Sequence, residues 1–159
     1  MKRNIKFIVV HCTATPQNLT VKNFLSEWGK GKKHEYPPYH YIIEKDGEAK
    51  QVLHEAIIAS GDFAHNSESV HVAYIGGIDK EGKPTDNRTE KQKDMLFGKL
   101  AELSDRYPHA EIVGKKDLCG VSDSDPSPCF DVKRWMENYL PDLSERPYFE
   151  TYEFEEEAA

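Results

Sequence analysis

The amino-acid sequence predicts an α/β fold, with a central mixed β-sheet flanked by helices. Short apolar runs rich in β-branched residues alternate along the chain with segments whose apolar residues recur at helical spacing. Two β-rich runs flank Asp46-Gly47, a dipeptide typical of hairpin turns. With 159 residues, of which 38% are hydrophobic, the chain is long enough for one domain with a core and too short for two of ordinary size.

The first predicted elements are a strand and a short helix. The run Ile5–Val10 is rich in β-branched residues, which is typical of a strand buried on both faces. Thr20 is a suitable N-cap for a helix that ends at Gly29 and Gly31. The apolar face of this helix consists of Val21, Phe24, Leu25 and Trp28.

A hairpin and a further strand follow in the middle of the chain. The hairpin is predicted within the segment YHYIIEKDGEAKQVL, around Asp46-Gly47. The next strand, Ser69–Ile75, ends at Gly76-Gly77. Residues Asp79–Arg88 read as a polar loop.

In the last third of the chain the sequence predicts a helix, a strand and a second helix. Thr89 and Gln92 form a capping-box pattern at the start of a helix that Pro108 ends. Its apolar stripe consists of Leu96, Leu100, Leu103 and Tyr107. Glu111–Gly114 reads as a short strand, and Asp131 is placed to begin the final helix.

We expect a globular domain over residues 1–143 and an acidic tail over residues 144–159. The formal net charge is −7, but Pro147–Ala159 carries five Glu and no basic residue, which leaves 21 basic against 23 acidic residues in the rest. A nearly neutral body lacks the basic field that nucleic-acid binding requires, so no nucleic-acid partner is expected. The acidic tail could engage a basic protein partner or serve only to solubilise the chain.

Two kinds of targeting segment are not predicted. The apolar run Phe7–Val10 is much shorter than the roughly 7–15 residues of a signal-peptide core. No window approaches the 18 or so apolar residues of a membrane-spanning helix, so no membrane partner is expected. A cytoplasmic location is the default expectation, and a route of export that needs no signal peptide stays open. The three cysteines, Cys12, Cys119 and Cys129, are too few for a disulfide scaffold and fit free thiols or metal ligands better.

Several short motifs in a fixed order carry the chemistry. His11 directly follows the first predicted strand, where a rigid element can hold a ligand or a base. The others are Tyr39-His40 before the hairpin, His65-Asn66-Ser67, Gly76-Gly77-Ile78-Asp79 and Pro128-Cys129-Phe130-Asp131. Each motif alone has an ordinary structural interpretation, but the set in this order is specific enough to indicate a protein family.

From Ile5 to about Tyr139 the sequence resembles the zinc N-acetylmuramoyl-L-alanine amidases, which include phage lysozyme-type amidases and peptidoglycan recognition proteins. The resemblance implies a peptidoglycan or muropeptide partner and hydrolysis of the amide between the lactyl group of muramic acid and L-alanine. It also implies zinc held by a histidine after the first strand, a second histidine after a late strand, and a cysteine or aspartate before the last helix. A tyrosine and, in many members, a lysine two residues before the cysteine assist.

The match of site residues is incomplete. His11 and Cys129 match metal ligands, and Tyr39 matches the helper tyrosine. The second histidine falls on Lys115, and the helper lysine falls on Ser127, which we retain as a candidate catalytic position. His65 and Asn66 are candidates for substrate binding.

Lys115 puts the zinc in question, because an ammonium repels a dication and a catalytic zinc needs about three protein ligands. One hypothesis is a metal-free site in which Lys115 stabilises a Cys129 thiolate. The other is a zinc site in which Cys119 replaces the missing ligand. The expected cofactor is therefore zinc if the protein is active, or none. The corresponding functions are an amidase, or a catalytically silent relative that binds muropeptide or a protein partner. Access to the cell wall by another route stays open, because a lysis protein released through a separate membrane pore would also lack a signal.

Overall fold

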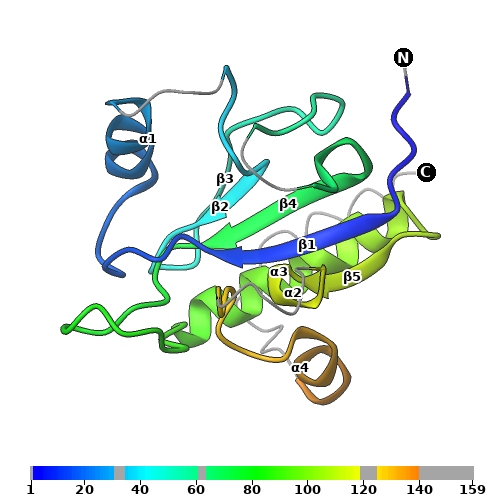
Figure 1. Ribbon diagram of the computed structural model, residues 1–159. Coiled ribbons are helices and arrows are strands. Elements are labelled where there is room, and N and C mark those ends of the chain that lie inside the picture. Colours follow the sequence, from blue (N-terminus) through cyan, green and yellow to red (C-terminus); the bar gives the residue numbers. More distant parts are fainter. Residues whose placement is uncertain (1, 31–34, 61–63, 119–124, 140–159) are drawn as a thin grey trace, which may run out of the picture.

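Five strands form one sheet in the computed structural model, which describes residues 2–30, 35–60, 64–118 and 125–139 (Figure 1). The strands are β1 (Phe7–Cys12), β2 (Tyr41–Ile43), β3 (Ala49–Gln51), β4 (Ser69–Tyr74) and β5 (Glu111–Gly114). They lie in the order β3-β2-β4-β1-β5. β3 is antiparallel to β2, and the other neighbouring pairs are parallel. The predicted mixed sheet and its hairpin are confirmed.

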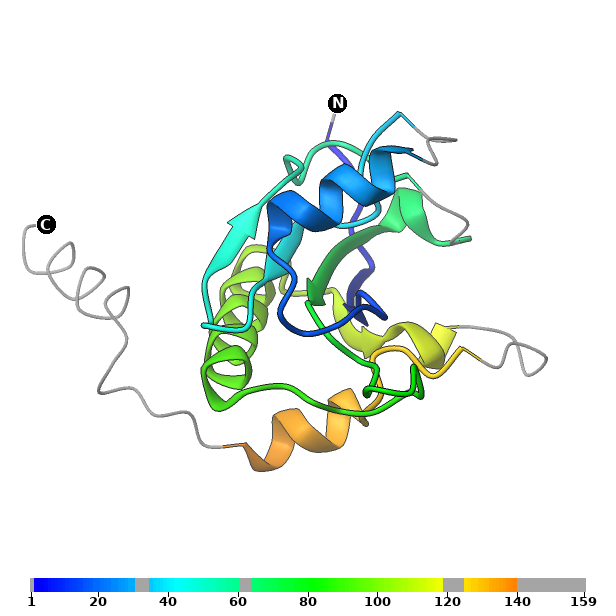
Figure 2. The same ribbon diagram turned by 90° about the vertical axis from the view of Figure 1, so that its left-hand side faces the viewer.

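Helices lie on both faces of the sheet, with α1 on one side and α2 and α4 on the other (Figure 2). The helices are α1 (Val21–Lys30), α2 (Glu90–Arg106), α3 (Lys115–Leu118) and α4 (Val132–Asn138), and the short 3-10 helix η1 spans Asn66–Glu68. No helix among the described residues is long and apolar enough to cross a membrane.

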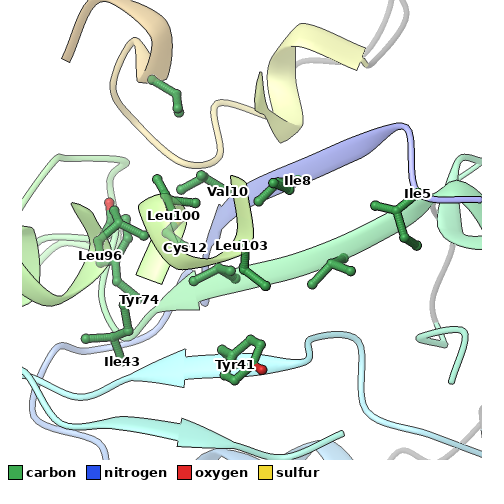
Figure 3. Close-up of a cluster of buried hydrophobic side chains, with 13 residues drawn as sticks. Ile5, Ile8, Val10, Cys12, Tyr41, Ile43, Tyr74, Leu96, Leu100 and Leu103 are labelled. Carbon is green, nitrogen blue, oxygen red and sulfur yellow. The ribbon is translucent and has the colours of Figure 1, made fainter. Parts of the chain in front are cut away.

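β1 lies between β4 and β5 in the sheet and is buried along nearly its whole length. Successive side chains of a strand point to opposite faces. Ile8, Val10 and Cys12 therefore pack into the larger core under α2 (Figure 3). The intervening residues, Val9 and His11, face the side that α1 covers in part.

The predicted ends of several elements are confirmed by their capping bonds. Thr89 and Gln92 form both bonds of the capping box at the start of α2. Asp131 accepts a hydrogen bond from the Arg134 amide at the start of α4. β1 differs from the prediction, because it continues to Cys12 by pairing with the end of β4, so His11 lies within the strand instead of after it. Neither α3 nor η1 was predicted, since a single helical turn has no apolar period to detect.

Glu55 connects the loop after β3 to the end of α2. Its carboxylate accepts hydrogen bonds from the Tyr107 hydroxyl at 2.7 Å and from Arg106 at 2.8 and 2.7 Å, and also from the Tyr41 hydroxyl. Burial disfavours the charged carboxylate, but these bonds outweigh it and lower the pKa of Glu55 from 4.5 to about 2.

The Glu55 cluster predicts a specific dependence of stability on pH. We expect Glu55→Gln to lower the free energy of unfolding by roughly 3 kcal/mol at neutral pH, because the native cluster favours the charged form. Since the native pKa is depressed, this stabilisation is present above about pH 4.5 and is lost as the pH falls toward 2. Urea unfolding of both proteins between pH 7 and acid measures the difference. A difference that stays constant with pH would contradict this account.

Candidate active site

The candidate site begins at the C-terminal end of β1, on the face that α1 covers. His11 is 5% exposed, and its Nε2 atom lies 2.7 Å from Nδ1 of His71 in β4. Val9 pairs with His71 and His11 with Ala73, so both imidazoles lie on the same face of adjacent parallel strands. Burial, followed by the charge of Lys115, lowers the pKa of His11 to about 3. His11 is therefore a neutral imidazole at physiological pH.

Tyr39 lies beside His11, as the sequence predicts. The two ring centroids are 5.0 Å apart, and the Tyr39 hydroxyl donates a hydrogen bond of 3.4 Å to the Cys12 carbonyl. Phe24 of α1 stacks on the Tyr39 ring, with the two ring centroids 5.8 Å apart. Burial raises the pKa of Tyr39, so the phenol stays protonated and remains a hydrogen-bond donor.

Lys115 is placed next to His11 by the pairing of β1 with β5. Val10 pairs with Gly114, so Lys115, which follows Gly114, lies beside His11, which follows Val10 in β1. The Lys115 ammonium forms an ion pair with Asp125. Burial opposes the charge on Asp125, but the bonds from Lys115 and from the Ser127 amide outweigh it and lower the pKa of this carboxyl. A lysine paired with a carboxylate thus occupies the position where the resemblance implies a histidine.

The Cys129 thiol faces Cys12 on the other side of the sheet from His11. Its sulfur lies 4.0 Å from the Cys12 sulfur and 3.6 Å from the Gly77 carbonyl oxygen. Burial, followed by the neighbouring Cys12, raises the pKa of Cys129 to about 12. The expectation that Lys115 stabilises a Cys129 thiolate is therefore wrong, because Lys115 pairs with Asp125 and the thiol stays protonated.

Ser127 is turned toward the backbone of β1. Its side chain is buried, and its hydroxyl oxygen accepts a hydrogen bond of 3.0 Å from the Cys12 amide. Its carbonyl accepts a bond of 3.0 Å from the Lys116 amide at the start of α3. Ser127 thus joins the segment before α4 to β1, and a catalytic role for it stays a prediction.

His65 and Asn66 lie at the opposite end of β1 from His11. The His65 ring packs edge-on against Phe7 at 5.4 Å, and the Asn66 carbonyl accepts a hydrogen bond of 3.2 Å from Arg3. Phe7 is on the same face of β1 as His11 but four residues earlier, which corresponds to about 13 Å along a strand. The structure does not bring these two residues to His11, and their role in substrate binding stays a prediction.

Comparison with known proteins identifies the family. Residues 1–128 match the family model described as N-acetylmuramoyl-L-alanine amidase. The chain belongs to this family.

Its curated relatives in the amidase family include phage endolysins. The endolysin of Enterobacteria phage K11 is 35% identical over 128 residues, which cover 80% of this chain and 82% of the relative. The endolysin of Escherichia phage T7 is 33% identical over 132 residues, which cover 82% of this chain and 84% of the relative.

Solved structures of amidases and peptidoglycan recognition proteins share the fold. The Ph2119 endolysin from the Thermus scotoductus MAT2119 bacteriophage has a TM-score of 0.66 at 24% identity, with 86% of each chain covered. Peptidoglycan recognition protein-1 of Manduca sexta has a TM-score of 0.64 at 17% identity, covering 95% of this chain and 89% of that one. The expected amidase fold is therefore confirmed.

The described side chains do not form the zinc site that the amidase family implies. His11 Nε2 is directed at His71, the Cys129 sulfur faces that of Cys12, and the Lys115 ammonium is paired with Asp125. In residues 2–30, 35–60, 64–118 and 125–139, the one group of three potential ligands within 4.8 Å of one another is the partly exposed acidic set Glu44, Asp46 and Glu48. Cys119, the proposed substitute ligand, lies outside the described residues.

Three neighbours of the site were not predicted as functional residues. His71 contacts His11, Asp125 pairs with Lys115, and Cys12 contacts Cys129. Strand alternation would place His71 on the same face as His11 once the register of β1 and β4 is known, but one sequence does not give that register. No sequence signal distinguishes Asp125 from other loop carboxylates.

The environment of Cys129 predicts slow reaction with alkylating agents. A pKa near 12 leaves far less thiolate at pH 8 than the value of about 8.5 for a free cysteine. We expect iodoacetamide to modify Cys129 at least about a hundredfold more slowly in the native protein than in urea. Mass spectrometry of the peptides separates Cys129 from the other two cysteines. Equal rates in the native and unfolded states would show that the thiol is not held as described.

Proposed function

We propose that this protein acts on peptidoglycan as an N-acetylmuramoyl-L-alanine amidase, hydrolysing the amide between the lactyl group of muramic acid and L-alanine. The observation that carries the proposal is the match of residues 1–128 to the amidase family. The contact between His11 and Tyr39, which the resemblance implies as site residues, supports it. Endolysins of similar length at 33–35% identity support it.

The protonation states of His11 and Tyr39 suit this chemistry. A neutral imidazole offers a lone pair that can bind a metal or accept a proton. A protonated phenol can donate a hydrogen bond to a carbonyl oxygen that develops negative charge. Zinc in this family would supply a polarised water. The arrangement of Cys129 and Lys115 does not fit zinc in the described state, so we assign no step to the metal.

The Lys115–Asp125 ion pair favours a second candidate, a catalytically silent relative. Its ammonium stands next to His11, where a metal-binding histidine is implied, and is already paired with a carboxylate. The helper lysine is also replaced by Ser127, whose hydroxyl is engaged with β1. Such a protein would bind muropeptide, or a protein partner, without cleaving it.

Purified murein sacculi distinguish the two candidates. Release of stem peptides with a free L-alanine amino group, together with about one tightly held zinc per chain, would establish the amidase. Retention of the protein on sacculi without such release would establish the silent relative. The absence of both release and retention would contradict the proposed peptidoglycan function in both forms and would leave only a relative that binds a protein partner.

Lys115→His tests whether position 115 is the missing ligand position. We expect the variant to bind zinc at least about tenfold more tightly than the wild type, because an imidazole replaces an ammonium beside His11. Lys116→His is the matched control, since Lys116 is adjacent but exposed, and it should leave zinc affinity unchanged. Competition with a chromogenic chelator measures both. Equal affinities of the two variants would show that Lys115 does not occupy the ligand position.

A further inference from the structure

Two cysteines that are 117 residues apart in the chain lie in contact on the α2 side of the sheet. The Cys12 sulfur lies 4.0 Å from the Cys129 sulfur, so no other heavy atom fits between them. Both are free cysteines, of which Cys12 is buried and Cys129 is partly buried. Cys12 belongs to the larger core, as Figure 3 shows. The pair is separate from His11, because neighbouring residues of β1 face opposite sides of the sheet.

Hydrogen bonds fix the backbone around both sulfurs. The Cys12 amide donates a bond of 3.0 Å to the Ser127 hydroxyl oxygen. The Tyr74 hydroxyl of β4 donates a bond of 2.7 Å to the carbonyl of Pro128, the residue before Cys129. The contact between the two sulfurs therefore depends on bonded backbone segments and not only on the rotamers of two side chains.

Gly77 makes room for the two thiols. A side chain at this position would place its Cβ atom 2.5 Å from the Cys12 sulfur, which is too close for a substitution. The Cys129 sulfur lies 3.6 Å from the Gly77 carbonyl oxygen. The lack of a Cβ atom at Gly77 thus leaves the sulfurs room to approach from 4.0 Å to the roughly 2.05 Å of a disulfide.

We propose that Cys12 and Cys129 form a reversible disulfide, which is closed under oxidising conditions and open under reducing ones. The oxidant is a small-molecule disulfide such as oxidised glutathione. The two protein S–H bonds break and one S–S bond forms, while the oxidant takes up both protons and both electrons and becomes two thiols. Exchange passes through a mixed disulfide of protein and oxidant, and the raised pKa of Cys129 makes it slow.

The disulfide would act on the candidate site through the segment that carries Cys129. The same segment holds Asp125, which pairs with Lys115 beside His11. Closing the bond ties this segment covalently to β1, so we expect the oxidised form to hold the Lys115–Asp125 pair more firmly. This regulation rests on the proposed function, because peptidoglycan lies outside the cytosol, in surroundings where disulfides persist.

Mass spectrometry of the full-length protein in glutathione buffers tests the pairing directly. We expect a peptide cross-linked through Cys12 and Cys129 and the loss of two hydrogens from the intact mass, both reversed by dithiothreitol. Each buffer is approached from the oxidised and from the reduced protein until the two agree, because the exchange is slow. Cys119→Ser is the matched control and should form the same cross-link. Free thiols alone, glutathione adducts alone, or a cross-link through Cys119 instead would overturn the proposal.

Thermal unfolding shows whether the bond fits the native contact. In the Cys119→Ser variant we expect the disulfide to raise the Tm by about 5 °C or more, because it restricts the unfolded chain across 117 residues. Adding Cys129→Ala removes the pair, and the Tm should then be the same in oxidising and reducing buffer. Cys12→Ala is a second such control if Cys129→Ala does not fold. An unchanged or lower Tm in the cross-linked protein would contradict the proposal.

Purified murein sacculi test the regulation separately from the disulfide. We expect oxidation to raise retention of the protein, or release of stem peptides, at least about threefold, because a site held in place loses less flexibility on binding. The variant with Cys129→Ala should show no difference between the two buffers. If the cross-link forms but oxidation changes neither quantity, the regulation is contradicted and the disulfide stands. If neither form is retained or releases peptides, the proposed function fails, whereas the disulfide is decided without any substrate.

Discussion

The alternation of side chains at the end of β1 governs the arrangement of both the core and the candidate site. β1 lies between two parallel neighbours, β4 and β5, and its residues from Ile8 to Cys12 are buried. Alternation sends His11 to the α1 side and Cys12 to the α2 side. Tyr39 and His71 then gather around His11, while Cys129 meets Cys12. Two residues that resemblance would join at one metal are therefore directed to different sides of one strand.

The charges around His11 are also balanced without a metal. Lys115 and Asp125 neutralise each other, and the neighbouring His11 is uncharged, since its pKa is lowered to about 3. A site with three anionic or neutral ligands would have a different field, since it would attract a dication instead of repelling it. Membership of the amidase family thus indicates catalysis, whereas the charges around His11 do not favour the metal on which that catalysis depends. The overall fold reflects the family membership alone.

Much of the fold could be predicted from the sequence because its signals are local. The hairpin at Asp46-Gly47, the capping box at Thr89 and the N-cap at Asp131 each depend on a few adjacent residues. The contacts of the site are long-range instead. His11 with His71, and Cys12 with Cys129, depend on strand register and on the path of a loop, which a single sequence does not encode in any local pattern. The resemblance located His11 and Tyr39 but not their partners.

Both edges of the sheet are protected from pairing with a second molecule. At one edge, β3 has only three residues, and its central Lys50 is exposed and charged. At the other, β5 has four residues, and Glu111 at its start is bridged to Lys133 of α4 at 2.6 Å. Short, charged edge strands offer little template for strand addition. The same sheet that is apolar through its middle is thereby guarded against the edge-to-edge aggregation to which exposed strands are prone.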